Sequence, residues 1–360
     1  MEKKLDRIKE AVQKIFKMDM KKIIFIYTPP KVGSTTLVTS LRVSLGKSCN
    51  VIHIHDDIML NVLSGISNVT VNEIINYLSQ ERKEVYVIDV YRTPIERKMS
   101  EFFEKISPYH FNNTEDNISR YNMQRVNDRF NKLFPHLALG EHYFDKYNIS
   151  NPVPFDFEKK YTIQEINNIK FIKIRLCDSS MWGQILTKIL KIEVIIIDDY
   201  QTDNKLIGAF YKRFKEEYRL PENYLELIKN CKYFNYYYSE EERNKYLDVW
   251  KQKLRGDFIP YTDLEYKFYV NLYLENQYIN DIQLDHYIDN GCYCKLCNKK
   301  RREIFFKAKK GEKITEKLIH YDVISNEIDN RNNKLVEVIK KKIASKKFQP
   351  KQFSINHINK

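Results

Sequence analysis

Short apolar runs that alternate with helical patterns most constrain the fold of this chain. Residues 22–27, Lys-Ile-Ile-Phe-Ile-Tyr, form a continuous apolar run that is typical of a strand buried on both faces of a parallel sheet. Similar runs follow at residues 51–55 and 85–91, and most of the segments between them have helical spacing. Strands that alternate with helices predict an α/β fold with a doubly wound, mostly parallel sheet. Two further strands are predicted at residues 171–176 and 194–197.

Composition divides the chain of 360 residues into three segments. Residues 1–19 place apolar side chains at spacings of three and four, which predicts an amphipathic helix. Residues 20–255 hold the predicted strands, and the polar, asparagine-rich stretch at about 104–160 is interpreted as an insertion in this α/β domain. Residues 256–360 are predicted to form a basic, helical C-terminal extension that carries a cysteine cluster.

Composition also bears on where the protein works. Apolar residues make up 42% of the chain and charged residues 30%, which favours an ordered globular protein. No apolar stretch reaches the ~20 residues of a membrane span, and the charged start precedes no signal core. Six scattered cysteines suit a reducing compartment. We therefore expect a soluble, cytoplasmic protein.

The net charge of +13 suits a polyanionic partner such as nucleic acid, an acidic polysaccharide or a nucleotide. A compositional origin explains the charge equally well, because Lys, Asn, Ile and Tyr are all abundant and much of the excess charge lies in the tail.

The first predicted strand runs directly into a turn whose chemistry suits phosphate. Gly33 lets the backbone approach an anion, and Lys31 adds a positive charge. Backbone N–H groups and the helix dipole would face the same anion at the start of the next helix. The loop is not a Walker A motif, which places its lysine after the last glycine. The alternative is a structural turn that only caps a helix. Ser34, Thr35 and Thr36 would supply hydroxyl groups to the anion, and Val32 belongs to the backbone of the same loop.

A second motif follows the third predicted strand. Thr93 is a predicted N-cap, with Pro94 at the first helical position and Glu96 completing a capping box. Arg92 then lies at the exit of the strand, and Ser100 lies about two turns along the helix. A guanidinium and a hydroxyl in this arrangement could hold a second phosphate. The alternative is that the arginine is a solvated charge at the helix end.

Together these two segments resemble sulfotransferases. Residues 30–37, Pro-Lys-Val-Gly-Ser-Thr-Thr-Leu, are similar to their 5′-phosphosulfate-binding loop, and Arg92 with Ser100 matches the spacing of their 3′-phosphate-binding element. More narrowly, the chain resembles the sulfotransferase-like family named for capsular polysaccharide synthesis. The resemblance covers about residues 20–255. That closer likeness also rests on His142–Asp145, Pro154–Asp156, Tyr211–Phe214, Leu220–Pro221 and Tyr237–Glu241.

The resemblance implies a P-loop-like sulfotransferase fold and a reaction. A sulfuryl group would pass from 3′-phosphoadenosine 5′-phosphosulfate (PAPS) to a hydroxyl of a saccharide-type acceptor. Lys31 would lie near the bridging oxygen between phosphate and sulfur, with Thr35 and Thr36 around the 5′-phosphate. Arg92 and Ser100 would hold the 3′-phosphate. No metal is needed for this role.

The acceptor hydroxyl needs a base. His55 ends the second predicted strand and Asp56 follows it, at the carboxyl edge where open α/β sheets place ligands. His55 is the preferred base, with Asp56 or Asp57 to orient or replace it, and a neutral structural histidine is the alternative. Glu101 and His142 are the reserves.

Cys292, Cys294 and Cys297 could supply three zinc ligands, with His286 or His320 as a fourth. The spacing is compact for a zinc knuckle, so we favour free thiols.

The predicted partners are PAPS and a saccharide or other hydroxyl acceptor. Two alternatives stay open: a non-catalytic relative that binds nucleotide or glycan, and an accessory protein that binds nucleic acid through the basic C-terminal region.

Overall fold

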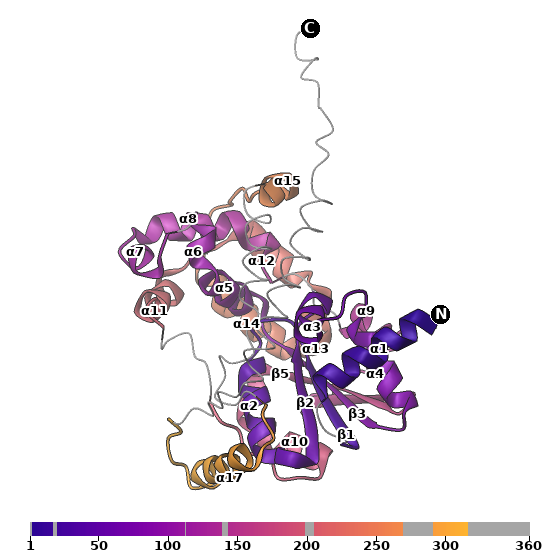
Figure 1. Cartoon of the computed structure of the whole chain (residues 1–360). Coiled ribbons are helices and arrows are strands. Elements are labelled where there is room, and N and C mark those ends of the chain that lie inside the picture. The colour runs from indigo at the N-terminus through magenta and orange to yellow at the C-terminus, as the bar shows by residue number, and fades with distance from the viewer. Residues whose placement is uncertain are drawn as a thin grey trace.

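A five-stranded mixed sheet forms the centre of the molecule, with strand order β2-β1-β3-β5-β4 (Figure 1). The computed structural model describes residues 2–16, 20–111, 113–138, 143–198, 205–268 and 291–315. The predicted α/β class and mostly parallel sheet are confirmed, since β2, β1, β3 and β5 run parallel and only β4 is antiparallel. The strands are β1 (Lys22–Tyr27), β2 (Cys49–Ile54), β3 (Glu84–Tyr91), β4 (Tyr161–Ile166) and β5 (Ile169–Arg175).

Helices cover both faces of the sheet, and alternate residues of each strand enter separate cores. On β1, Phe25 packs with α1 (Glu2–Ile15), α3 (Asp57–Ser64) and α4 (Val71–Gln80). Ile24 and Ile26 face the other way, toward α2 (Ser34–Leu45) and α10 (Trp182–Leu190). Burial on both sides explains why the parallel strands read as continuous apolar runs.

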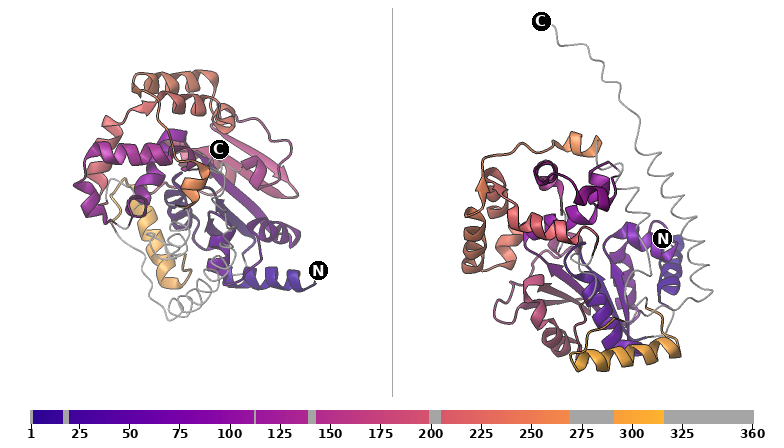
Figure 2. Two further views of the ribbon diagram at one scale, coloured as in Figure 1. Left: turned by 90° about the horizontal axis from the view of Figure 1, so that it is seen from above. Right: turned by 90° about the vertical axis from the view of Figure 1, so that its left-hand side faces the viewer.

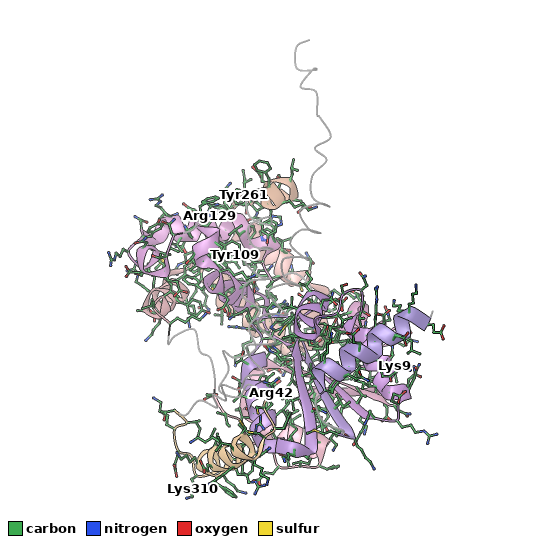
Figure 3. The ribbon with its side chains drawn as sticks, in the orientation of Figure 1. Lys9, Arg42, Tyr109, Arg129, Tyr261 and Lys310 are labelled. Atoms are coloured by element: carbon green, nitrogen blue, oxygen red, sulfur yellow. The ribbon has the colours of Figure 1, made fainter. Side chains whose placement is uncertain are left out.

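A helical part lies beyond the carboxyl ends of the strands, at the upper left of Figure 1. Its aromatic side chains join the core of one sheet face; Phe102, for example, stacks against Tyr109 at 5.6 Å. At its outer edge Arg129 donates a hydrogen bond to the hydroxyl of Tyr261 (Figure 3). Besides α10 and one later helix, the described helices that follow β3 are α5 (Pro94–Glu104), α6 (Ile106–Tyr109), α7 (Glu115–Ser119), α8 (Met123–Leu133), α9 (Tyr143–Lys146), α11 (Gly208–Glu217), α12 (Glu222–Lys229), α13 (Lys232–Tyr237), α14 (Glu240–Lys251) and α15 (Asp263–Tyr266).

The last described helix, α17 (Lys295–Lys309), packs against α2 and the short 3-10 helix η1 (Gly46–Ser48). Figure 2 shows it along the edge of the sheet domain, far from the helical part. Val43, Ile197 and Ile304 form a separate buried cluster at this contact. The remaining short elements are η2 (Phe134–His136), η3 (Leu176–Met181) and the paired strands β6 (Leu220–Pro221) and β7 (Leu254–Arg255).

The prediction of a strand at residues 194–197 is wrong. This apolar segment joins no sheet, and it lies along α2 instead. Its N–H groups donate to side-chain hydroxyls: that of Ile195 to Ser44 Oγ at 3.0 Å, and that of Ile197 to Ser40 Oγ at 2.8 Å. The hydroxyls of a helix thus satisfy the backbone that a neighbouring strand would otherwise pair.

The sheet contains a strand that the prediction missed. Strand β4 pairs antiparallel with β5 across a two-residue turn. Both turn residues, Asn167 and Asn168, have positive φ angles of 50° and 63°. Two asparagines between alternating apolar residues are a hairpin signal that could have revealed β4.

The predicted start of α5 is confirmed, but its capping box is wrong. Thr93 is the N-cap and Pro94 the first helical residue, yet Thr93 makes no side-chain capping hydrogen bond. Tyr246 of α14 takes that role, because its hydroxyl accepts from the N–H of Ile95 at 3.3 Å and donates to Glu96 Oε2 at 2.7 Å. A distant residue therefore caps this helix.

Among the described residues, no helix is both long enough and apolar enough to cross a membrane.

Candidate functional site

The sheet topology brings the two predicted phosphate-binding segments together. Strand β1 lies between β2 and β3. The connection that follows β1 runs toward β2, whereas the connection that follows β3 runs the other way, toward β4 and β5. Such a switch point opens a crevice at the carboxyl ends of the strands. Thr28, the first residue after β1, accepts a hydrogen bond from the N–H of Val90 at 3.1 Å. This contact ties the end of β3 to the loop after β1.

The loop between β1 and α2 has the left-handed backbone of a tight turn. Lys31 has a φ of 66° and Gly33 a φ of 87°. A Cβ atom on Gly33 would lie 2.9 Å from Leu176 Cδ1 and 3.1 Å from Trp182 Cη2. Glycine is therefore required here for two reasons. The backbone has a left-handed conformation, and the segment that leads from β5 into α10 lies too close for a side chain.

Helix α2 begins directly after this turn. Its first three residues are Ser34, Thr35 and Thr36, as predicted, so three hydroxyls lie at a helix N-terminus. Ser34 is buried, while Thr35 and Thr36 are half-buried. Val32 is fully buried in the core between the sheet and α2, and its packing there anchors the middle of the loop.

Arg92 holds the loop from the side of β3. Its Nη1 donates to the backbone oxygen of Lys31 at 2.9 Å. Ser100 is buried on α5, and Glu104, one helical turn further, is on the same face. That face is directed toward the loop, because Glu104 contacts the Lys31 side chain. The structure thus gathers Lys31, Arg92 and the Ser100 face around the crevice.

A shared carboxylate neutralises the lysine of the loop. Lys31 Nζ lies 3.0 Å from Glu104 Oε2, and Lys205 binds the same oxygen. Burial lowers the pKa of Lys31, although the Glu104 charge opposes this. Burial alone would raise the pKa of Glu104, but Lys31 and Lys205 lower it to about 2. Sequence reasoning missed both partners, since neither belongs to a motif.

His55 lies beside the same loop. Its Nδ1 is 2.6 Å from the backbone oxygen of Thr28, and a carbonyl oxygen can only accept, so Nδ1 carries the proton. The lone pair therefore lies on Nε2. Burial lowers the pKa of His55 to about 4, against the opposing effect of the Thr28 bond. His55 is a neutral imidazole, which is the protonation state of a general base.

The two aspartates after β2 support local structure. Asp56 is the N-cap of α3 and accepts from the N–H of Met59 at 2.8 Å. Asp57 accepts from the N–H of Val71 at 2.8 Å, which joins α3 to α4. A role for Asp56 in orienting His55 stays a prediction.

Lys146 is a further cation at this edge of the sheet, and no sequence pattern marked it. It comes from α9 and donates to the backbone oxygen of His55 at 2.6 Å, with its amine 3.5 Å from the ring centre of Tyr27. Burial lowers the pKa of Lys146 to about 8, while Asp89 and the two aspartates after β2 oppose that shift. Its neighbours are backbone and aromatic groups, which only the tertiary structure assembles.

The remaining predicted residues have separate positions. Glu101 is half-buried on α5, one turn before Glu104, and its role as a reserve base stays a prediction. His142 lies outside the described residues, as do His286 and His320. The sulfur atoms of Cys292, Cys294 and Cys297 cluster near the start of α17, and Tyr293 between them contacts Cys49 at the start of β2, the end of the strand opposite His55.

Comparisons of the chain with protein-family models, with characterised proteins and with solved structures find no match.

Proposed function

We propose that this protein is a sulfotransferase that transfers a sulfuryl group from PAPS to a hydroxyl of a saccharide-type acceptor. The observation that carries the proposal is the contact between Arg92 and the backbone of Lys31 at the switch point of the sheet. It places two segments that resemble the two phosphate-binding elements of sulfotransferases against each other.

The phosphosulfate group would bind at the start of α2. The N–H groups of the first helical turn have no partner within the helix, and the helix dipole favours an anion there. The hydroxyls of Thr35 and Thr36 add donors, and Gly33 presents backbone without a side chain. The 3′-phosphate would bind Arg92, whose guanidinium keeps further N–H donors besides the one used by Lys31. Ser100 would add a hydroxyl on the same side.

The chemistry needs charge stabilisation and one proton transfer. The acceptor oxygen forms a bond to sulfur while the bond from sulfur to the bridging phosphate oxygen breaks, and the electron pair stays on the phosphate. Protonated Lys31 stabilises that leaving oxygen. The acceptor proton passes to Nε2 of His55, the ring nitrogen that carries the lone pair when Nδ1 donates to the Thr28 oxygen. The products are the sulfated acceptor and adenosine 3′,5′-bisphosphate.

In this proposal Glu104 competes with the nucleotide for Lys31. Lys31 and Lys205 share the Glu104 carboxylate, and a bound phosphosulfate would draw Lys31 away from it. A non-catalytic relative would instead keep the Lys31–Glu104 pair when a nucleotide is bound.

The test is thermal unfolding of the full chain with adenosine 3′,5′-bisphosphate, with ATP and magnesium, and without ligand. At one hundred times its dissociation constant the bisphosphate should stabilise the protein by about 2.7 kcal/mol. Lys31→Ala and Arg92→Ala should lose this shift. Lys9→Ala, which changes an exposed lysine on α1 (Figure 3), should keep it.

The outcomes separate the alternatives. A shift with ATP and magnesium alone, or a bisphosphate shift that survives both variants, contradicts the proposal. Bisphosphate binding without release of bisphosphate from PAPS, over a panel of saccharide acceptors, favours the non-catalytic relative.

A basic groove favours a second candidate function, the binding of nucleic acid. The groove lies between η1 and α17 and has a volume of about 460 Å³. If nucleic acid binds in this groove, the affinity for RNA or DNA should depend steeply on salt concentration, and Lys31→Ala should not change that dependence. Its lining residues are Lys47, Lys295, Asn298, Lys299, Arg302, Glu303 and Phe306.

A further inference from the structure

Three cysteines meet where the described C-terminal segment begins. The sulfur atoms of Cys292, Cys294 and Cys297 all lie within 4.8 Å of one another. Cys297 is buried, and the other two are half-buried. No other such group of three or more histidine, cysteine, aspartate or glutamate ligands occurs in the described part of the chain.

The surrounding backbone fixes the three side chains. Cys294 is the N-cap of α17, and its sulfur accepts from the N–H of Cys297 at 3.4 Å. Asn298 donates from Nδ2 to the backbone oxygens of Tyr293 at 2.5 Å and Cys294 at 2.8 Å. The hydroxyl of Tyr293 in turn donates to the backbone oxygen of Cys49 on β2 at 3.1 Å. The cluster is thus connected to the sheet rather than carried on a loose end.

Gly291, just before the cluster, has a φ of 80°. A Cβ atom there would lie 3.1 Å from Arg42 Cζ, so the turn requires glycine. Arg42 itself donates to the backbone oxygen of Val51 at 3.3 Å, and Figure 3 shows it on α2, beside α17. The chain therefore enters the cluster along a path that α2 and β2 fix.

We propose that Cys292, Cys294 and Cys297 bind a zinc ion through three thiolates. In a tetrahedral site with Zn–S bonds of ~2.3 Å, neighbouring sulfurs lie about 3.8 Å apart. Sulfur pairs already within 4.8 Å reach that geometry by side-chain adjustments of about 1 Å. The N–H group that donates to Cys294 Sγ is the type of outer contact that orients a metal ligand. The site is independent of the proposed transferase function.

A zinc ion would have a structural role at the start of α17. Ile304 of this helix packs with Val43 and Ile197 in a separate buried cluster, and Cys297 and Arg301 of the helix are buried as well. A metal ion bound by the three thiolates would join the chain just before α17 to the first turn of the helix, because the ligands lie at residues 292, 294 and 297. A disulfide would serve less well, because three cysteines leave one unpaired.

The experiment measures metal in the full chain, purified under reducing conditions with added zinc and without a histidine tag. We expect one zinc per chain after gel filtration. Cobalt in place of zinc should give the absorption bands of thiolate ligands in a tetrahedral site. Cys292→Ser and the double variant Cys292→Ser/Cys294→Ser should each bind zinc at least tenfold more weakly.

Cys231→Ser is the matched control, because Cys231 is also half-buried but lies outside the cluster. It should keep the metal and the cobalt spectrum. Thermal unfolding with and without zinc supplies a second measurement, in which wild type and the control gain stability from zinc and the cluster variants do not. Three outcomes would each overturn the proposal. They are a zinc content below one-tenth per chain in wild type, an equal zinc content in wild type and the double variant, and selective retention of copper(I).

Discussion

Glu104 sets how much charge Lys31 can offer to an anion. It is partly buried, and its pKa of about 2 keeps it ionised throughout the physiological range. Because Lys31 and Lys205 share one carboxylate oxygen, any anion at the loop competes with it. The charge of the site therefore depends on a residue 73 positions away from the loop.

Replacing that carboxylate should strengthen anion binding. We expect Glu104→Gln to bind adenosine 3′,5′-bisphosphate about tenfold more tightly, or about 1.4 kcal/mol, because two lysines lose a competing negative charge. Isothermal titration calorimetry measures this change. Glu193→Gln is the control, since Glu193 pairs with Lys309 at 2.7 Å on the surface. Unchanged or weaker affinity in Glu104→Gln would contradict the competition.

At the level of elements, the turn between β1 and α2 is where strand, helix and anion site meet. Two separate constraints act on Gly33: a positive φ, and contacts with Leu176 and Trp182 that leave no room for a Cβ atom. Gly65 ends α3 with a similar φ of 69° but has open space around it, and Gly256 meets no atom within 4 Å. These three glycines allow the two constraints to be separated.

Alanine at the three positions should have graded effects. We expect Gly256→Ala to change the free energy of unfolding by less than about 0.5 kcal/mol. Gly65→Ala should cost about 1 kcal/mol from its backbone conformation. Gly33→Ala should cost about 2–4 kcal/mol, since steric overlap adds to the same strain. Urea unfolding measures all three, and equal losses for Gly33→Ala and Gly65→Ala would show that the close approach does not matter.

At the scale of the whole molecule, two histidines whose pKa is lowered by burial couple stability to pH. Burial lowers the pKa of His55 to about 4. Burial, followed by the charges of Arg129 and Arg125, lowers that of His110 to about 4 as well. An unfolded chain protonates these residues near pH 6.5, so between pH 6.5 and 4 it binds more protons than the folded chain.

The free energy of unfolding should therefore be highest above pH 6.5 and fall as the pH drops toward 4. Each histidine contributes a slope of up to about 1.4 kcal/mol per pH unit. Chemical denaturation of wild type and His55→Asn at several pH values measures the slope, which the variant should reduce. In Glu104→Gln the slope should change only below about pH 4.5, because the lowered pKa of Glu104 acts between 4.5 and 2. A slope unaffected by His55→Asn would contradict the neutral, buried imidazole.

Local sequence determined the central features of the fold. Residues 22–27 and 85–91 are apolar on both sides, so they could form only strands covered on both faces, and the parallel sheet follows from that. The sequence also located the turn at Gly33 and the start of α5 at Thr93 and Pro94, because glycine and proline restrict the backbone by themselves.

Tertiary structure decided whatever depends on a partner distant in sequence. Residues 194–197 have the composition of a strand, yet they lie along α2 because Ser40 and Ser44 satisfy their N–H groups. Tyr246, rather than the side chain of Thr93, accepts an N–H at the start of α5. The pairing of Lys31 with Glu104 likewise follows from the packing of α5 against the loop. Hydrogen bonds and charges act over a few ångströms of space, and local sequence does not specify which distant groups the fold brings within that range.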